Sequence, residues 1–389
     1  MGASLVTVAA GPAHPRLRRV HQVVPVLLHA DAIGDETRAI RDGLRARGIA
    51  SDVFALPQAR AAANLDASAL PLNALLAGPA PDAVLYHFAV SSPASAALAA
   101  SGLPVVLIHH NVTPPHWFHM VDPEHEVALA AAEEELPGLR SRVALALGDS
   151  EYTRRELDAM GFAPTGVLPI LLDQAPYREH RPGPLHQEIG AAPTLLTVGR
   201  VAPNKRIEDC IRLLAAYRAG VDPRARLWIA GDDGRLPVYR DALARLVDRL
   251  RLGDAVRFLG RVTQQELIDC YRGATAYVSM SEHEGFGVPL LEAMVCDLPV
   301  LAHAATAVPF TLGDAGLQMR DKDFPLLAEA LGALLGDALA LRDQRERGRR
   351  RAAELAPERT LDHLVALLDS VAVRSADARL RPHESLPQR

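Results

Sequence analysis

Two glutamates, Glu284 and Glu292, bracket a glycine-rich turn in the carboxyl half of the chain. The intervening residues are Gly-Phe-Gly-Val-Pro-Leu-Leu. Gly285 and Gly287 allow the backbone to turn tightly and to come close to a ligand, and the proline suits the first turn of a helix. Unpaired amides at the start of a helix, reinforced by the helix dipole, make a cradle for a diphosphate. This segment therefore predicts an anion site with a carboxylate on each side.

We assign the parts of this ligand by the chemistry of each group. The backbone amides of Leu290 and Leu291 are expected to be unpaired and to receive the diphosphate, and Phe286 lies within the same ligand-binding turn. Carboxylates accept hydrogen bonds from hydroxyls rather than from phosphate, so we expect a sugar at Glu284 and a ribose at Glu292. The alternative is that both glutamates only cap and solubilise a surface helix.

A second segment, Val198-Gly-Arg-Val-Ala-Pro-Asn-Lys-Arg-Ile, places Arg200 and Lys205 in one short loop after an apolar run. In doubly wound sheets, ligands bind at the carboxyl ends of the strands, where this loop would lie. Both cations could reach a diphosphate and stabilise the charge that builds on a departing phosphate. The alternative is that Arg200 and Lys205 are ordinary surface charges.

Composition narrows the classes of partner and cofactor. A formal charge of −5 gives no general attraction for polyanions, so we do not expect nucleic acid to be a partner. The 15 histidines show no HExxH or other close ligand spacing, and the three cysteines show no CxxC pair. We therefore expect no bound metal, no cofactor and no disulfide framework, and a reducing cytoplasm as the compartment. No apolar run approaches a membrane span, which leaves at most peripheral membrane association.

These chemical groups must be positioned by two series of alternating strands and helices. The first series is expected over 23–28, 36–47, 83–86, 94–100, 105–108, 126–136 and 143–147. The second is expected over 195–198, 207–217, 225–230, 238–250, 256–259, 265–271, 275–278, 289–295 and 299–302. The predicted fold class is α/β, with two doubly wound, Rossmann-like domains facing a cleft.

The 389 residues exceed what one core usually serves, and changes in composition suggest the boundaries. We expect an N-terminal tail, an acceptor-side domain, a linker rich in Pro, Gly, His and charge, a ligand-binding domain, a helix that crosses back to the first domain, and a disordered tail. These six parts are placed at 1–20, 21–175, 176–192, 193–355, 356–372 and 373–389.

Four motifs occur in one order along the second half: Gly-Arg-x4-Lys, Leu-Trp-Ile-Ala-Gly-Asp-Asp-Gly, Phe-Leu-Gly-Arg-Val and Glu-x7-Glu followed by Pro-Val-Leu-Ala. Together they resemble the retaining glycosyltransferases of family four, whose fold is GT-B. The resemblance implies that Glu284 binds sugar hydroxyls, that Glu292 binds ribose, and that Arg200 and Lys205 bind the diphosphate. It also implies that Val262 meets the base through its backbone and that Gly231 lies close to the nucleotide.

Two positions depart from the family pattern. His303 stands where a small polar residue is common, and Phe310 stands where Glu often follows the proline. These departures bear on the sugar and the acceptor rather than on the nucleotide site.

The first half offers weaker candidates, all beside strand ends. Gly34 lies between the first strand and its helix, where it could approach the donor or could serve the turn alone. The resemblance implies a histidine after the run 105–108 that contacts the donor sugar; counting along the strand favours His110 over His109, and a structural histidine is the alternative. His87 is a weaker candidate for the acceptor side.

Two further features of this half have mainly structural interpretations. Ser150 is expected to be a helix cap. The aromatic loop 114–119 is expected either to receive the acceptor or touch a membrane, or to pack in the core.

The resemblance implies a retaining hexosyl transfer from a UDP or GDP sugar to an acceptor hydroxyl, in polysaccharide, glycolipid or glycoconjugate biosynthesis. The leaving phosphate would itself deprotonate the acceptor, so neither a protein nucleophile nor a metal is required, and activity is expected to survive EDTA. Two alternatives are a sugar-nucleotide epimerase or hydrolase on the same fold, and a noncatalytic partner subunit that binds nucleotide sugar.

Overall fold

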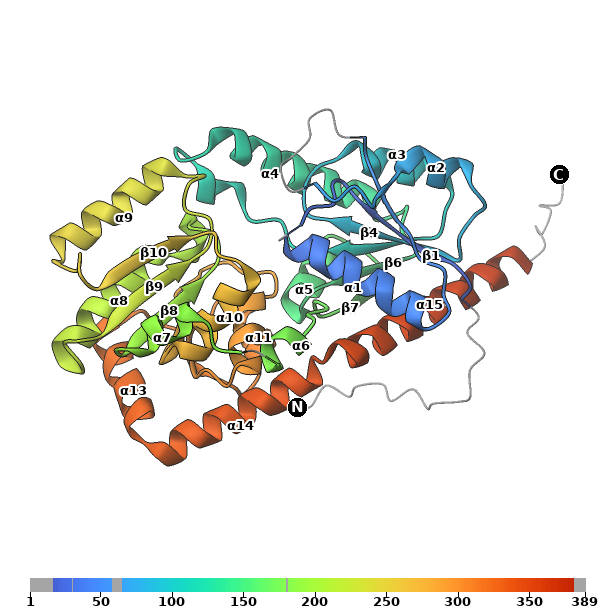
Figure 1. Ribbon diagram of the computed structural model, residues 1–389. Coiled ribbons are helices and arrows are strands. Elements are labelled where there is room, and N and C mark those ends of the chain that lie inside the picture. The colour runs from blue at the N-terminus through green and yellow to red at the C-terminus, as the bar shows by residue number, and fades with distance from the viewer. Residues whose placement is uncertain (1–16, 30, 58–64, 180, 381–389) are drawn as a thin grey trace.

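The computed structural model describes residues 17–29, 31–57, 65–179 and 181–380, and Figure 1 shows two α/β domains beside each other. In the first domain, seven described strands form a parallel sheet in the order β3-β2-β1-β4-β5-β6-β7. They are β1 Val20–Val24, β2 Val53–Ala55, β3 Leu70–Pro71, β4 Ala83–Phe88, β5 Val105–His109, β6 Leu145–Gly148 and β7 Thr165–Val167. The central strands β1, β4 and β5 are buried along their whole length, as expected when helices cover both faces of a parallel sheet.

Helices connect these strands and place polar residues at their carboxyl ends. They are α1 Ala32–Ala46, α2 Leu72–Ala77, α3 Pro93–Ser101, η1 Pro115–Phe118, α4 Pro123–Glu135, η2 Leu136–Leu139 and α5 Glu151–Ala159. Asp31 caps α1 by accepting a hydrogen bond from the Gly34 amide at 3.0 Å. Ser150 and Thr153 form a capping box at the start of α5, so Ser150 is the helix cap that we expected.

The second domain repeats the architecture with six described strands in the order β10-β9-β8-β11-β12-β13, all parallel. The strands are β8 Thr194–Val198, β9 Arg226–Ala230, β10 Val256–Gly260, β11 Ala276–Ser279, β12 Val300–His303 and β13 Leu317–Met319. The helices are α7 Pro184–Gly190, η3 Pro203–Lys205, α8 Ile207–Gly220, α9 Pro237–Arg249, α10 Gln264–Gly273, α11 Val288–Val295, α12 Val308–Leu312, α13 Phe324–Gly336 and α14 Ala338–Glu354. The predicted fold class is thus confirmed.

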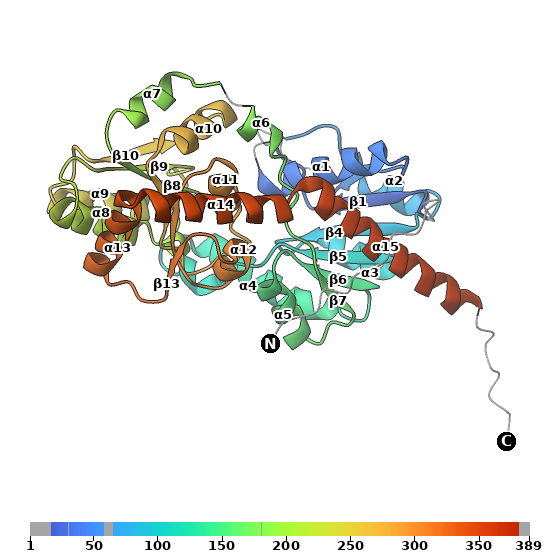
Figure 2. The same ribbon diagram turned by 90° about the horizontal axis from the view of Figure 1, so that it is seen from below.

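The chain passes between the domains twice, at α6 Ala175–Arg178 and between α14 and α15 Pro357–Leu380. Figure 2 shows α14 along the second domain and α15 along the first. Leu361, Leu364 and Leu368 of α15 are buried in the core of the first domain. The Gln174 amide donates hydrogen bonds to the carbonyls of residues 352 and 355, at 3.1 and 3.2 Å, so the two crossings are tied together.

The expected domain boundaries differ from the structure in three places. Leu17 is buried and Val20 begins β1, so the folded chain starts before residue 21; residues 1–16 lie outside the described part. The expected linker 176–192 contains α7, whose Ile189 is buried because Gly273 of α10 lets it approach closely. The last helix continues to residue 380, beyond the expected end at 372, while residues 381–389 lie outside the described part.

No single helix of the described residues combines the length and the apolar composition of a membrane span. α13 and the segment Ala338–Ala372 reach that length and composition only as a pair, with a bend of 95° between them.

Candidate active site

An ion pair between Lys205 and Glu284 lies at the carboxyl edge of the second sheet. Lys205 ends η3, which follows β8, and Glu284 follows the neighbouring strand β11. The Lys205 Nζ lies 2.7 Å from both Glu284 carboxylate oxygens, and the two side chains are 20% and 13% exposed. An ammonium group has three donors and a carboxylate can accept several hydrogen bonds, so both groups keep capacity for a ligand.

Neighbouring polar groups fix the backbone on which this pair stands. The Glu284 amide donates to the Thr306 hydroxyl at 2.9 Å, and that hydroxyl donates to the Glu284 carbonyl at 3.0 Å. The buried Asn204 amide donates to the His283 carbonyl at 3.2 Å, which joins the Lys205 loop to the Glu284 loop. The ion pair is therefore held before any ligand arrives, as a catalytic constellation requires.

Arg200 is a cation in the same loop, and no described residue forms a hydrogen bond or ion pair with it. Its side chain remains exposed at the surface and lines a shallow pocket together with Asp122 and Arg235. Desolvation in this pocket and the nearby Arg235 guanidinium both lower the pKa of Arg200. A guanidinium with unused donors beside a second cation suits a phosphate, because it forms bidentate, charge-assisted hydrogen bonds.

Glu292 is buried and its carboxylate is held by two tyrosines. Tyr271 of α10 donates to Oε2 at 2.7 Å, and Tyr177 of α6 donates to Oε1. Burial raises the pKa of Glu292, and the two tyrosine hydroxyls oppose that shift. The carboxylate predicted to bind a ribose is thus engaged by a residue of the interdomain crossing, and a ribose would have to share or replace the Tyr177 hydroxyl.

The turn between the two glutamates has the expected glycine conformation but not all the expected free amides. Gly287 has φ +85° and caps α11. The expectation that the Leu290 amide is unpaired is wrong, because it donates to the Gly287 carbonyl at 2.9 Å in a tight first helical turn. Leu291 and Phe286 are buried in the core.

The remaining predicted residues of the second domain also lie at strand ends. Gly231 has φ +141° and follows β9; a Cβ there would lie 2.0 Å from the Gly199 carbonyl oxygen, so only glycine allows this backbone crossing. Val262 is half-buried in the loop after β10. Both loops lie at the same sheet edge as Lys205 and Glu284.

In the first domain, His110 does not present its ring to the cleft. The side chain is 3% exposed, its Nε2 lies 2.9 Å from His87 Nδ1, and its Nδ1 lies 3.6 Å from Glu36 Oε2. Burial lowers the pKa of His110 well below its usual value and lowers the pKa of His109 to about 4. Both rings are buried, so the expected ring contact with a donor sugar is absent from this arrangement, and His110 faces the second domain through its backbone.

Gly34 serves a tight local contact. A Cβ at this position would lie 2.2 Å from the Leu28 carbonyl oxygen, which favours the interpretation that the glycine serves the turn. In the aromatic loop, Phe118 is buried in the core of the first domain, whereas Trp117 is half-buried and His119 is exposed. The loop therefore packs on the core through Phe118 and, in part, through Trp117.

Several contacts join the domains across the candidate site. Arg235 lies 4.0 Å from Asp122, and the Arg155 guanidinium lies over the Phe310 ring. The His283 imidazole hydrogen-bonds the side chain of Asn111, which follows β5. Gly285 packs closely on the same loop, since a Cβ there would lie 2.6 Å from Asn111 Cβ. The departure from the family pattern at position 310 thus supplies an interdomain contact.

Sequence reasoning missed Asp149, which directly follows β6. Its Oδ2 would lie 3.1 Å from a Cβ on Gly285, and it accepts a hydrogen bond from Thr153 at 2.8 Å. Burial raises the pKa of Asp149 to about 7, and the nearby carboxylates of Glu156 and Glu284 add to the rise. A search of polar residues directly after each strand would have found Asp149 and Asn111, whereas nothing local marks Tyr177 or Glu36.

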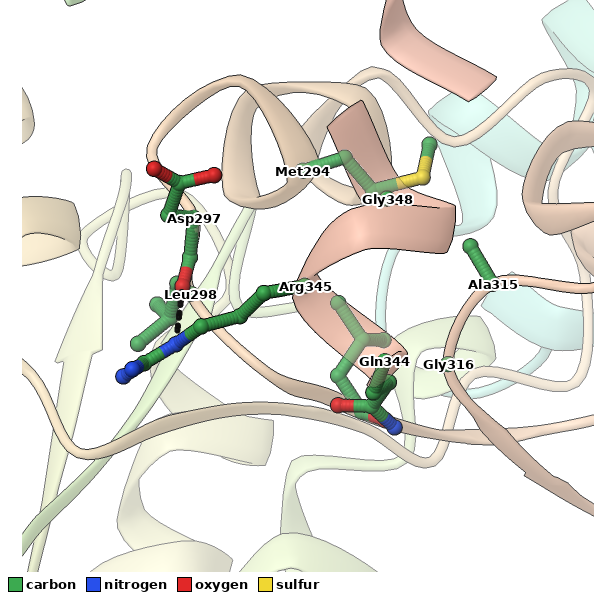
Figure 3. Close-up of a pocket in the computed structure, with 9 residues that line it drawn as sticks. Met294, Asp297, Leu298, Ala315, Gly316, Gln344, Arg345 and Gly348 are labelled. Atoms are coloured by element: carbon green, nitrogen blue, oxygen red, sulfur yellow. Dashed lines mark hydrogen bonds between the residues drawn. The ribbon is translucent and has the colours of Figure 1, made fainter. Parts of the chain in front are cut away.

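One small pocket lies away from this site. Figure 3 shows it between α11 and α14, where Arg345 donates to the carbonyl of residue 297. Its lining includes Val300, the first residue of β12, which places it at the amino edge of the second sheet. This pocket is therefore distinct from the carboxyl edge, where the predicted residues gather.

Residues 186–352 match the model of the family described as Glycosyl transferases group 1. The O-antigen chain mannosyltransferase B of Escherichia coli is 33% identical over 144 residues, which are 37% of this chain and 37% of that protein. The D-inositol 3-phosphate glycosyltransferase of Frankia alni is 38% identical over 148 residues, 36% of each chain. The alignments thus span little more than a third of either relative.

A solved structure resembles nearly the whole chain. The Anabaena protein HepE, in complex with UDP and glucose, superposes with a TM-score of 0.67 at 17% identity, covering 91% of this chain and 99% of that one. At this identity the likeness shows the fold alone. The chain therefore has the GT-B fold, with a second domain that matches the glycosyl transferases group 1 model.

Proposed function

We propose that this protein is a retaining glycosyltransferase of family four that moves a hexosyl group from a nucleoside diphosphate sugar to an acceptor hydroxyl. The observation that carries the proposal is the preformed Lys205–Glu284 pair, beside the unpaired Arg200, at the carboxyl edge of the second sheet. Ligands of doubly wound sheets bind at this edge. The match of residues 186–352 to a glycosyltransferase family supports the proposal.

The donor is arranged by charge and hydrogen bonding. Arg200 and Lys205 receive the diphosphate, Glu284 accepts hydrogen bonds from sugar hydroxyls, and Glu292 accepts them from the ribose. The turn at Gly285 and Gly287 brings the backbone close to the sugar. The base lies near Gly231 and Val262, where backbone contacts leave both UDP and GDP sugars as candidates.

The transfer needs no nucleophile from the protein. The bond between the anomeric carbon and the phosphate oxygen breaks as the acceptor oxygen attacks from the same face, and the acceptor proton passes to the departing phosphate. Lys205 and Arg200 stabilise the negative charge that develops on that phosphate. These two cations supply the positive charge that a divalent metal supplies in metal-dependent enzymes. Turnover is therefore expected to survive EDTA.

The acceptor binds on the first domain, in the cleft opposite the donor. The E. coli relative is named for O-antigen chains and the Frankia relative for an inositol phosphate, which supports acceptors bearing several hydroxyls. We place the reaction in the synthesis of a polysaccharide, glycolipid or glycoconjugate. The three described cysteines are free and buried, which agrees with a cytoplasmic protein.

The proposal is tested first by nucleotide binding and then by transfer. Thermal melting of the protein with UDP, GDP, and their glucose and mannose conjugates, in EDTA, should rise for one nucleotide series. Proton NMR of the anomeric region then follows the donor with and without an acceptor panel. Formation of a glycoside with the donor's anomeric configuration supports the proposal. Inversion, or consumption of the donor at the same rate with and without acceptors, would contradict it.

A further inference from the structure

Four buried side chains of the first domain form a row that includes the His110 ring, for which the family resemblance implied a contact with the donor sugar instead. The Gln22 Oε1 lies 3.0 Å from His87 Nε2, His87 Nδ1 lies 2.9 Å from His110 Nε2, and His110 Nδ1 lies 3.6 Å from Glu36 Oε2. Gln22, His87 and Glu36 are each at most 1% exposed. Buried polar rows of this kind are costly unless each member is paired, so the positions of the hydrogens can be worked out.

Gln22 fixes the direction of the row. Its Nε2 donates to the carbonyl of Thr37 at 2.9 Å, so its Oε1 must be the atom that faces His87. His87 therefore carries its hydrogen on Nε2 and leaves a lone pair on Nδ1. That lone pair requires a hydrogen on His110 Nε2, and a neutral His110 then has a bare Nδ1 that faces Glu36.

With His110 neutral, Glu36 completes the row only in its own neutral form. Its Oε1 accepts a hydrogen bond from the Leu171 amide at 3.1 Å, while Oε2 has no hydrogen-bond partner among the described residues. A carboxylate Oε2 facing the bare His110 Nδ1 would place two acceptors against each other. A hydroxyl at Oε2 would instead present a donor to that nitrogen, 3.6 Å away, which also has no hydrogen-bond partner among the described residues.

We propose that Glu36 is a neutral carboxylic acid whose hydroxyl faces His110. Gln22, His87, His110 and Glu36 then form a row, here called the relay, that positions the loop at His110 and Asn111 against the predicted donor site at Gly285. The consequence for catalysis rests on the proposed function; the hydrogen arrangement does not. Glu36 is thus a positioning residue that acts through His110.

The surroundings of the row favour the neutral form of its titratable side chains. Burial raises the pKa of Glu36 to about 8, the Leu171 amide opposes this, and the Asp149 carboxylate adds to it. Burial lowers the pKa of His87 to about 3. The titratable groups facing Glu36 are His110 after β5, His87 on β4 and Asp149 after β6, and none of them supplies a fixed positive charge that would hold Glu36 ionised.

The relay connects directly to the cleft. The carbonyl oxygen of His110 and the Cβ of Asn111 both pack on Gly285, which lies in the turn between Glu284 and Glu292, here called the donor loop. A Cβ built on Gly285 would lie 3.3 Å from that oxygen and 2.6 Å from the Asn111 Cβ. Asn111 has φ 61°, a left-handed conformation that needs support from its surroundings. By fixing the His110 ring, the relay holds this strained turn, and hence the wall of the predicted sugar pocket.

A metal ion held by the same three side chains is the competing interpretation. Glu36, His87 and His110 each offer a ligand atom, and these atoms lie within 4.8 Å of one another. However, the two imidazoles are nearly parallel, at 4°, with ring centroids 5.2 Å apart and facing nitrogens 2.9 Å apart. Each nitrogen therefore lies near the line between the rings and points at its partner, as in a hydrogen bond, rather than at a shared third point.

The first test reads the hydrogens in the wild-type protein, with histidine labelled by ¹⁵N. We expect NMR to show His87 and His110 as neutral rings with hydrogen on Nε2 from pH 5.5 to 7.5. The resonances of His119, an exposed histidine outside this row, serve as the reference in the same spectra. Hydrogen on Nδ1 of either ring, or protonation of either ring in this range, would overturn the relay.

The second test distinguishes a protonated Glu36 from an ionised one. Glu36→Gln keeps a donor toward His110 and an acceptor for the Leu171 amide, whereas Glu36→Ala keeps neither. In the wild type, the His110 Nδ1 resonance should shift with a midpoint near pH 8, and Glu36→Gln should abolish that shift. Persistence of the shift in Glu36→Gln would show that another group titrates.

Activity and metal content complete the test. The transfer should lose at least tenfold in kcat/KM as pH rises through this midpoint in the wild type but not in Glu36→Gln. If the histidines have the expected tautomers but the protein transfers no sugar, the proposed function alone is contradicted. If the protein transfers sugar but the histidines have other tautomers, the relay alone is contradicted. One tightly held Zn²⁺ per chain, whose removal by EDTA changes the His87 and His110 resonances, would show a metal site instead.

Discussion

The two domains treat their polar side chains in opposite ways. In the second domain, Lys205 and Glu284 form a half-buried ion pair at the sheet edge, and the exposed Arg200 has no hydrogen bond or ion pair with any described residue. In the first domain, Glu36 and His110 lie below the surface, where burial shifts the pKa of each toward its neutral form. The second domain thus presents fixed charge to a ligand, whereas the first supplies a rigid wall without charge.

This difference follows from the cost of burial. A charge buried without a partner is expensive, so a group deep in a sheet either pairs or becomes neutral. Charges at a loop edge keep partial hydration and remain available for a phosphate. The same strand-end position therefore predicts different chemistry according to how deeply the side chain is set, and each of the following changes tests one side of this comparison.

Removing the cations of the second domain should have the largest effect. If each cation stabilises charge in the transition state, as proposed, Lys205→Ala and Arg200→Ala should each lower kcat/KM by about 10²–10³-fold. Steady-state kinetics measures this effect. Arg261→Ala is the matched control, since this exposed arginine lies near the same edge but pairs with Asp232. Equal losses in all three variants would show a general electrostatic effect rather than a site.

Replacing the Glu36 carboxyl group with an amide should change how stability depends on pH. Its raised pKa means that the unfolded chain loses the proton first, so Glu36 lowers stability progressively as pH rises from about 4.5 to about 8. Glu36→Gln should therefore gain stability relative to the wild type between pH 5 and 8, on the order of 2–4 kcal/mol. Urea unfolding at both pH values measures the gain. An unchanged difference between the two proteins would mean that Glu36 is ionised in the fold.

Alanine substitutions of the two glutamates of the donor loop should differ in their effects on stability and on nucleotide binding. Glu292→Ala leaves the hydroxyls of Tyr177 and Tyr271 without their acceptor, which should cost about 1–3 kcal/mol and weaken nucleotide binding. Glu284→Ala should leave nucleotide binding nearly intact and mainly reduce turnover. Calorimetric titration with free nucleotide compares them. Equal loss of nucleotide affinity would refute the division into ribose and sugar sites.

The interdomain contact of Phe310 should have the smallest effect. Its ring centroid lies 5.3 Å from the Arg155 guanidinium, a cation–π contact worth roughly 0.5–1 kcal/mol at an exposed site. Phe310→Ala should leave the unfolding of each domain nearly unchanged but raise the KM for the donor a few-fold. Arg240→Ala, which removes a similar contact within the second domain, is the control. A large loss of stability in Phe310→Ala would show that its role is internal packing.

The sequence predicted best those features that depend only on residues close together along the chain. Residues 105–108 of β5 and 227–230 of β9 are continuous apolar runs, so the doubly wound order followed from the alternation of such runs with helical patterns. Lys205 and Glu284 followed from their positions after strand ends. The linker was predicted poorly, because α7 owes its place to a close approach between Ile189 and Gly273 that no local pattern announces.

The relay and the tyrosine pair could not have been predicted. Glu36 looks like any exposed glutamate on an amphipathic helix, and only the packing of α1 on the first domain, with Leu171 and His110 beside the carboxyl group, buries it. Tyr177 meets Glu292 across 115 residues of sequence. The ring of His110 was expected to face the cleft, but at a strand end, one residue decides which side of the sheet a side chain enters.

The central claim is that the edge carrying Arg200 and Lys205 binds a nucleoside diphosphate without a metal. Isothermal titration of UDP and of GDP in EDTA, against the wild type, Lys205→Ala and the Arg261→Ala control, tests it most directly. We predict that one nucleotide binds the wild type and the control alike and binds Lys205→Ala at least tenfold more weakly. Failure of both nucleotides to bind the folded wild type, or equal binding by all three proteins, would contradict the claim.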